Sequence, residues 1–237
     1  MKRSLLLLFA FILFFSGCQS SCQKKDRKSP ESAPAAADYP SKTQQEESKV
    51  YQLKVTYPVT GNAAVDGVID GFVKNQISEF KKDMTVGDMP AEARNEIQID
   101  YSVSSFDDQY KSFRFEVMTY TGGAHPNTDI LTRTFDMKSG KLISLSDLFK
   151  PGSDYLNALS RIAFDQIKAK VENTDAGWVK KGTAPTAENY GAFLLDEKDL
   201  VIVFQAYQVA PYVEGPQEVK IPYAQLKDSL NPPFSGK

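Results

Sequence analysis

The chain shows an alternation of apolar and polar residues that recurs several times after residue 50. Residues 51–57 place Tyr51, Leu53, Val55 and Tyr57 at every second position, which is typical of a strand with one buried face. From residue 62 the apolar positions recur every three or four residues up to residue 80, so we expect an amphipathic helix capped by Asn62. Alternating runs then return at 97–103, 113–117 and 130–135, and their short spacing predicts antiparallel hairpins.

The second half repeats this order of elements. A turn at 136–140 leads to a helix that we expect Ser153 to cap, with an apolar face between residues 156 and 171. Strands are predicted at 193–195, 200–207 and 218–223, followed by a short amphipathic helix at 224–230, whereas the stretch around Trp178 is expected to be irregular. Helices separated by antiparallel strands indicate an α+β fold, with one amphipathic helix packed per half. We place the two halves at residues 49–135 and 136–237.

The N-terminus has the pattern of an exported lipoprotein. Lys2 and Arg3 precede an apolar run over residues 5–15, and small residues then lead to Cys18. As a helix this run rises only ~16 Å, too little to cross a hydrocarbon core of roughly 30 Å. We therefore expect residues 1–18 to form a signal peptide ending at a lipidated Cys18. Ordinary cleavage near Gly17 and an uncleaved anchor remain the alternatives.

A tether is predicted between the anchor and the folded part. Residues 19–48 are rich in Ser, Gln, Lys, Glu, Ala and Pro and hold almost no large apolar side chain, so they cannot bury enough surface to fold. Once Cys18 is lipidated, Cys22 is the remaining thiol, and no intramolecular disulfide is expected. Cys22 is an incidental free thiol in one interpretation, and in another it pairs between chains or carries a second acyl group.

Charge and motif content narrow the classes of function. The formal net charge is −2, and loss of the signal peptide with Lys2 and Arg3 lowers it to about −4, which argues against a nucleic-acid partner. The sequence holds no glycine-rich phosphate loop, no GxSxG elbow and no HExxH helix. We expect no cofactor and no metal.

Three segments resemble a known family. They are TGGAHPNT at 121–128, GKLISLSDLF at 140–149 and FQAYQVAPYVEGPQEVKIPY at 204–223. They are similar to the paired extracellular domains of unknown function in RsiV anti-sigma factors, and at the front of peptidoglycan deacetylases of the PdaC type. The resemblance covers residues 49 to about 232. It implies a PdaC-like first half and an RsiV-like second half that bind an envelope ligand, either a peptidoglycan fragment or a wall-cleaving enzyme such as lysozyme.

The first candidate binding residues lie in the GGAH turn. His125 is the only histidine of the chain and has no histidine partner for a metal site, so a zinc ion would need carboxylates such as Asp100 or Asp129. Gly122 and Gly123 are expected to permit a tight turn with positive φ, with the imidazole hydrogen-bonded to nearby backbone. Asn127 closes the motif and joins the candidate set.

The remaining candidates are aromatic residues in the second half. Tyr207 and Tyr212 lie in a loop interrupted by two prolines and a glycine, where they either contact a ligand or pack on the sheet edge. Trp178 either stacks on a ligand or fills the core. Neighbouring acids such as Asp107 and Asp108 point in different directions on a turn and do not support a glycosidase.

We therefore expect a non-catalytic ligand-binding module on a lipid anchor. The anchor would lie on the outer membrane facing the periplasm in a two-membrane bacterium, a location favoured by Gln19 after the lipidated cysteine, and on the outer face of the cell membrane otherwise. Two alternatives stay open. The module is a peptidoglycan-modifying enzyme that uses His125 and carboxylates, or it is a purely structural envelope lipoprotein.

Overall fold

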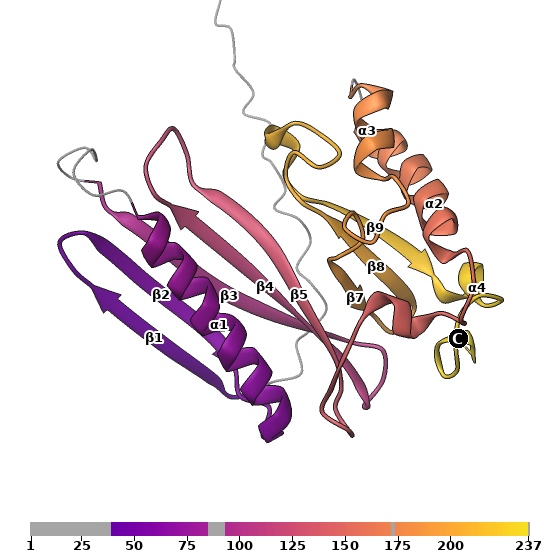
Figure 1. Cartoon of the computed structure of the whole chain (residues 1–237), viewed down its shortest axis with the longest axis horizontal. Helices are drawn as coiled ribbons and strands as arrows, with labels where there is room; N and C mark the ends of the chain where they lie inside the picture. Colours follow the sequence, from indigo (N-terminus) through magenta and orange to yellow (C-terminus); the bar gives the residue numbers. More distant parts are fainter. Residues whose placement is uncertain (1–38, 85–92, 172–173, 237) are drawn as a thin grey trace, which may run out of the picture. The chain divides into compact units, whose positions relative to one another are not determined.

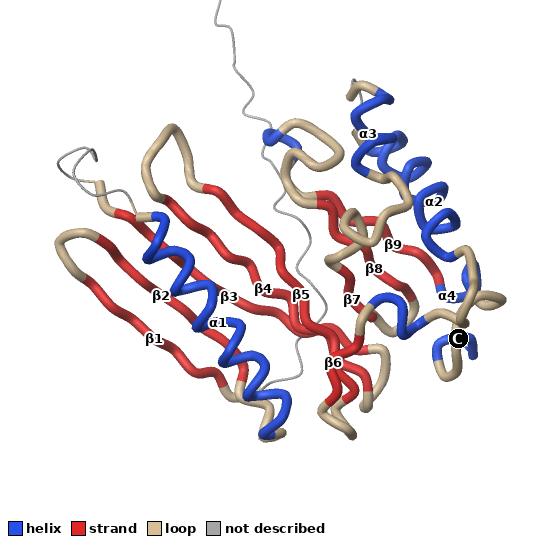
Figure 2. Tube along the Cα trace, viewed as in Figure 1, coloured by secondary structure: helices blue, strands red, loops and turns tan. Residues whose placement is uncertain are grey.

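Each half of the chain builds its own β-sheet (Figures 1 and 2). The computed structural model describes residues 39–84, 93–171 and 174–236. Within these residues the strands form a six-stranded sheet, in the order β1-β2-β3-β4-β5-β6, and a three-stranded sheet, in the order β7-β8-β9. The α+β prediction is confirmed. The signal-peptide prediction, including Cys18, and the first part of the predicted tether lie outside the described residues.

The six-stranded sheet carries one long helix on one face (Figure 1). As predicted, Asn62 caps this helix, because its side-chain oxygen accepts from the backbone nitrogens of Ala64 and Val65 at 3.0 and 3.4 Å. The apolar stripe of the helix packs against the inward-facing residues of the strands. The elements are β1 (Ser41–Glu47), β2 (Tyr51–Pro58), α1 (Ala63–Asp83), β3 (Asn95–Ser105), β4 (Tyr110–Tyr120), β5 (Asn127–Asp136) and β6 (Lys141–Ile143).

The predicted hairpins joining β3, β4 and β5 are confirmed as antiparallel pairs. One pair in the sheet is parallel, that between β2 and β3. The expected sheets were antiparallel, and this pair differs because α1 connects its two strands. The helix returns the chain to the end of the sheet at which β2 begins, so β3 runs in the same direction as β2. β6 also pairs with β5, so the first sheet extends past the expected boundary at residue 135 to Ile143 (Figure 2).

The predicted end of the tether at residue 48 is wrong, because β1 begins at Ser41. All seven residues of β1 are exposed, so the strand has no apolar face that an alternating pattern could reveal. Backbone pairing with β2 holds the strand. Two ion pairs also tie it to α1, Lys42 with Asp70 at 3.4 Å and Glu46 with Lys81 at 3.1 Å.

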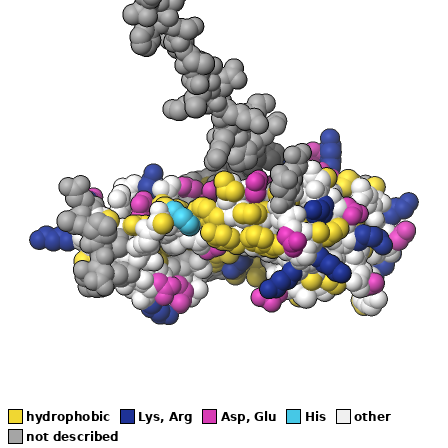
Figure 3. Space-filling model, turned by 90° about the horizontal axis from the view of Figure 1, so that it is seen from above, with side chains coloured by type: hydrophobic (Ala, Val, Ile, Leu, Met, Phe, Trp, Pro, Cys, Tyr) yellow, Lys and Arg dark blue, Asp and Glu magenta, His cyan; other side chains and the backbone are white. Residues whose placement is uncertain are grey.

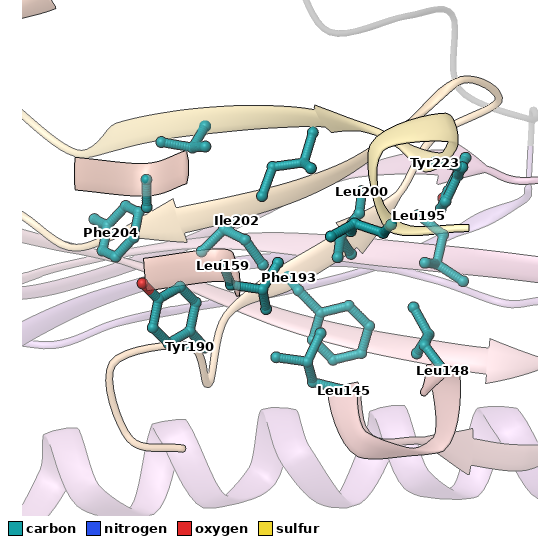
Figure 4. Packing of buried hydrophobic residues seen from close by; sticks show 14 of the residues in the cluster. Leu145, Leu148, Leu159, Tyr190, Phe193, Leu195, Leu200, Ile202, Phe204 and Tyr223 are labelled. Carbon is teal, nitrogen blue, oxygen red and sulfur yellow. The ribbon is translucent and has the colours of Figure 1, made fainter. Parts of the chain in front are cut away.

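The second half forms a larger apolar core under its own helices (Figure 4). The α2 side chains Leu159, Ala163 and Ile167 are fully buried, as the predicted helix face requires. Figure 4 shows Leu159 near Ile202 of the sheet and Leu145 beside Phe193. The elements are η1 (Leu145–Leu148), α2 (Tyr155–Lys170), α3 (Ala176–Gly182), β7 (Phe193–Leu195), β8 (Asp199–Phe204), η2 (Tyr212–Glu214), β9 (Gln217–Pro222), α4 (Tyr223–Leu226) and η3 (Phe234–Gly236).

Three local predictions in this half are wrong. Ser153 does not cap α2, since Asp154 occupies the cap position and the Ser153 hydroxyl is buried without a hydrogen-bond partner in the described structure. The segment around Trp178 is not irregular, because Asp175 accepts from the Trp178 backbone nitrogen at 2.9 Å and starts α3. The C-terminal helix α4 ends at Leu226 and is shorter than expected.

Hydroxyl side chains join the two sheets. The backbone nitrogens of Phe193 and Leu195 in β7 donate to Thr132 and Ser112 of the first sheet at 3.1 and 2.9 Å. Ser104 returns a hydrogen bond to the Leu195 carbonyl at 3.0 Å. The free edge of β7 is therefore satisfied by the face of the first sheet, as buried backbone groups require. All described residues accordingly fall within one compact unit.

Candidate functional site

Two loops and the start of α3 meet at one surface of the molecule. The first loop is the turn between β4 and β5, residues 121–126, and the second connects β8 to β9 over residues 205–216. Four aromatic side chains, one of them the lone histidine, lie there in contact with one another or with the same backbone. We call this group, His125, Trp178, Tyr207 and Tyr212, the aromatic surface.

His125 and Tyr212 form the centre of the aromatic surface. Their rings stack with centroids 4.2 Å apart and planes 20° apart. The Tyr212 hydroxyl donates to the Pro126 carbonyl at 2.8 Å, and His125 Nδ1 lies 2.9 Å from the same oxygen. Because a carbonyl only accepts, Nδ1 carries the hydrogen of that bond, which leaves Nε2 of the neutral ring as an acceptor on the exposed side chain.

Tyr207 extends the aromatic surface in a strained backbone conformation. Its ring lies 5.4 Å from that of Tyr212, and 54% of the residue is exposed. Its φ is 67°, and it is the only non-glycine residue with positive φ in the described structure. Such a conformation costs roughly 1–2 kcal/mol for an L-residue. Strain of this kind concentrates at functional sites, where the surrounding structure holds it in place.

Trp178 supports Tyr207 from the side of α3. Its indole nitrogen donates to the Tyr207 carbonyl at 2.9 Å, and its side chain is half-buried rather than enclosed in the core. Trp178 is thus neither a core plug nor fully exposed. Figure 3 shows the single histidine, in cyan, at the surface beside hydrophobic side chains.

Two glutamines hold the second loop in position. The Gln205 side chain accepts from the Ile130 nitrogen and donates to the Ile130 carbonyl, both at 2.8 Å, and so pairs with β5 much as a strand would. The Gln208 side chain accepts from the Gln205 nitrogen and donates to the carbonyls of Gly182 and Asn189. Sequence reasoning missed both residues, because an amide side chain has no periodic or spacing signal of its own.

Gly182 allows the loop to approach α3 closely. A Cβ atom at this position would lie 2.0 Å from the Gln208 carbonyl oxygen and 2.8 Å from Val209 Cγ1. A glycine is therefore required for the two segments to touch.

The remaining predicted residues shape the first loop. Gly122 and Gly123 have φ of 103° and 99°, which confirms that they permit the turn. The Tyr120 hydroxyl donates to the Gly123 carbonyl at 3.1 Å. Asn127 is exposed, and its side chain donates to Asp129 at 3.0 Å at the start of β5.

Few ionisable groups surround His125 in the described structure. His125 has Pro126 and Tyr212 as its partners, and no carboxylate contacts its ring in the described part of the chain. Asp129 binds Asn127, and Asp100 accepts from Gln98. Over residues 39–84, 93–171 and 174–236, no group of three or more His, Cys, Asp or Glu side chains could hold a metal ion. In the same residues, no helix combines the length and apolar character needed to cross a membrane.

Comparison with known families matches two consecutive parts of the chain. Residues 44–128 match the family described as deacetylase PdaC, and residues 146–224 match the family described as protein of unknown function DUF3298. The chain is also similar to peptidoglycan-N-acetylmuramic acid deacetylase PdaC from Bacillus subtilis (strain 168), with 32% identity over 193 residues. That match covers 81% of this chain but 41% of the deacetylase. The chain therefore spans less than half of that relative.

Two solved structures share the fold. A DUF3298 family member from Bacteroides fragilis matches with a TM-score of 0.60 and 21% identity, covering 85% of this chain and 97% of that one. A DUF3298 family protein from Pseudomonas aeruginosa matches with a TM-score of 0.58 and 14% identity, covering 83% and 96% of the two chains. At these identities the likeness extends to the fold alone.

Proposed function

We propose that the chain is a cell-wall module that binds its ligand without transforming it. The match to the PdaC family followed by the match to the DUF3298 family, which together cover most of its described part, supports this proposal. The ligand class is a peptidoglycan fragment or a wall-cleaving enzyme such as lysozyme. The similarity to a peptidoglycan deacetylase supports the cell wall as the setting. The surface described above supports the binding role.

The observation that carries this proposal is the aromatic surface, in which Tyr207 has a strained backbone conformation. Tyr207 keeps a positive φ that a non-glycine residue rarely adopts, and this conformation holds an aromatic ring in solvent beside Tyr212. Exposed aromatic rings offer flat apolar faces with polar ends, which suit a sugar ring or an apolar side chain of a protein partner.

An enzyme that uses His125 is the alternative, and its geometry is less favourable. A catalytic triad pairs its histidine with a nucleophile and an orienting carboxylate, whereas the His125 ring is stacked on Tyr212 and hydrogen-bonded to the Pro126 carbonyl in the described structure. Replacing His125 with Gln separates the two functions. If the chain is an enzyme, the His125→Gln variant should lose nearly all turnover on peptidoglycan. If it is a binding module, the variant should lose at most a few kcal/mol of binding free energy.

The location follows from the N-terminal sequence. We place the module at the envelope surface, anchored by lipid on Cys18, because a charged segment and a short apolar run precede that cysteine. Mass spectrometry of the protein from its native membrane tests this placement. Diacylated Cys18 at the mature terminus is the expected result, and an unmodified cysteine in cytosolic protein would refute it.

Binding is tested by retention on purified sacculi and on immobilised lysozyme. The Tyr212→Ala and Tyr207→Ala variants should bind the true ligand at least about tenfold more weakly, equivalent to roughly 1.4 kcal/mol. Val68→Ala is a matched control, because it removes an exposed apolar side chain from α1, outside the site. Failure of the wild-type chain to bind either material would refute the proposal.

A further inference from the structure

Arg133 is a partly buried cation without an acidic partner. It lies on β5, and within the described residues no carboxylate lies within 4.0 Å of its guanidinium. Its contacts are a hydrogen bond of 2.7 Å to the Thr132 carbonyl and the Phe72 ring, whose centroid lies 4.4 Å away. Burial lowers the pKa of Arg133 from its ordinary value, and no nearby acid offsets this effect.

This arrangement leaves donors of Arg133 available. A guanidinium has five N–H groups, and the structure gives one hydrogen bond to it as donor. Partly buried charges in proteins are generally paired, because desolvation without a partner is costly. For comparison, Arg114 of the neighbouring strand is similarly half-buried and pairs with Glu218 at 2.7 Å.

Arg133 lines a depression of about 310 Å³ at the edge of β5. The last residue pair between β5 and β6 joins Thr134 to Ile143, and the Gln205 side chain occupies the edge of β5 at Ile130. Between them, no strand of the described structure covers the β5 edge at Thr132. The opposite wall comes from the start of η1, the start of α2 and residues 187–193. Three of the lining residues, Leu145, Tyr190 and Phe193, also belong to the apolar core drawn in Figure 4.

The depression also holds hydroxyl groups and lacks a free negative charge among its lining residues. Ser144, Ser146 and Tyr155 line it together with Arg133. The nearest acidic neighbour of these serines, Asp147, accepts hydrogen bonds from Ser144 and pairs with Lys141 at 3.1 Å. A peptide C-terminus is recognised by a positive charge, hydrogen-bond donors and a free strand edge. The depression offers Arg133, several hydroxyl groups and the uncovered edge at Thr132.

We propose that this depression, the Arg133 pocket, binds the carboxylate of a small ligand, most simply the C-terminus of a short peptide that ends beside Thr132 at the edge of β5. A planar guanidinium matches a carboxylate with two parallel hydrogen bonds, and one guanidinium balances its single charge. The volume is at the lower end for small-molecule sites, which suits a ligand the size of a dipeptide. The pocket shares no residue with the aromatic surface and does not depend on it.

The experiment compares an acid with its amide. Binding of N-acetyl-alanyl-alanine and of its C-terminal amide to the purified chain is measured by isothermal titration and by NMR. We expect the acid to bind with a Kd of about 1 mM or tighter and the amide at least tenfold more weakly. Both the all-L and the all-D forms are tested, since an ordinary protein terminus is L and the alanine ends of cell-wall peptides are D.

Two variants locate the site. Arg133→Met should lower the affinity for the acid at least tenfold, whereas Arg161→Met, which removes an exposed arginine of α2, should leave it within twofold. Equal binding of acid and amide by the wild-type chain would overturn the proposal, as would undetectable binding of every acid. If Arg133→Met does not fold, the comparison of acid with amide still decides, because it uses the wild-type chain.

Discussion

At the scale of single residues, the candidate site consists of aromatic side chains from two loops and from α3. His125, Tyr207 and Tyr212 could be selected from the sequence because they lie among glycines and prolines, which are typical of loops, and Trp178 because it is the single tryptophan. The structure brings these four together through stacking and shared carbonyls. The positive φ of Tyr207 could not be predicted, because it arises from the contacts of Gln205, Gln208 and Trp178 with distant backbone.

The strain at Tyr207 is testable by two substitutions. Tyr207→Ala removes the ring but keeps the left-handed backbone, whereas Tyr207→Gly removes both the ring and the penalty. We expect the glycine variant to be the more stable by about 1 kcal/mol, since only glycine adopts positive φ without cost. Urea unfolding measures the difference. An alanine variant as stable as the glycine variant would show that the residue is unstrained.

Asp70 provides a pH-dependent prediction. Hydrogen bonds from Lys74 and then from the Tyr57 hydroxyl lower the pKa of Asp70 from its ordinary 3.8 to about 2. Its contribution to stability is therefore complete above about pH 4 and is lost as the pH falls toward 2. We expect Asp70→Asn to lower the free energy of unfolding by about 1–2 kcal/mol at pH 7.

The same variant should approach the wild-type stability as the pH falls to about 2, because Asp70 is then protonated in the unfolded chain and about half protonated in the folded chain, so that most of its contribution is lost. Denaturant unfolding from pH 7 to pH 2 measures this convergence. Asp165→Asn, on an exposed position of α2, controls for the loss of one carboxylate. A difference between Asp70→Asn and wild type that stays constant with pH would contradict the assignment.

At the scale of elements, the sequence predicted those with a buried face and missed those without one. β2 and α1 were predicted because Leu53 and Val55 alternate and because Val65 and Ile69 recur at helical spacing. β1 was missed because all its residues are exposed. α3 was missed because its seven residues, among them Gly177 and Gly182, are too few to display a helical period.

Gly182 tests the contact between α3 and the second loop. Gly182→Ala should lower stability by about 3 kcal/mol, because its Cβ would lie 2.0 Å from the Gln208 carbonyl oxygen. Gly71→Ala is the matched control in α1, where nothing lies within 4 Å of the added atom, and it should stabilise the protein by about 0.5–1 kcal/mol. Thermal unfolding compares the two. A Gly182→Ala variant as stable as wild type would refute the close approach.

Ser112 tests the junction between the sheets. Its hydroxyl is fully buried, accepts from the Leu195 nitrogen at 2.9 Å and contacts the Thr134 hydroxyl at 2.8 Å. Ser112→Ala leaves the Leu195 N–H without a partner and should cost about 1–3 kcal/mol. The partly exposed Ser102 of β3 is the control, and Ser102→Ala should stay within about 0.5 kcal/mol of wild type. A neutral Ser112→Ala variant would contradict the role of the hydroxyl in joining the sheets.

At the scale of the whole molecule, the two matched families each supply part of one surface. His125 lies in the part that matches PdaC, whereas Trp178, Tyr207 and Tyr212 lie in the part that matches DUF3298. Neither half alone therefore carries the aromatic surface. The sequence predicted two halves with similar element order, but it did not predict that they pack into one unit. The hydrogen bonds that join them come from hydroxyl and amide side chains, which leave no periodic pattern in the sequence.

Trp178 allows ligand binding at the aromatic surface to be measured directly, since it is the only tryptophan of the chain and lies within that surface. The intrinsic fluorescence of the chain is titrated with soluble peptidoglycan fragments and, separately, with tryptophan-free binding fragments of wall-cleaving enzymes, while binding is followed independently by sedimentation. We predict a saturable change in Trp178 emission that tracks binding and disappears in Tyr207→Ala and Tyr212→Ala but persists in Val68→Ala. If sedimentation shows binding but Trp178 emission does not change, the ligand binds elsewhere on the molecule, and the aromatic surface is not its binding site.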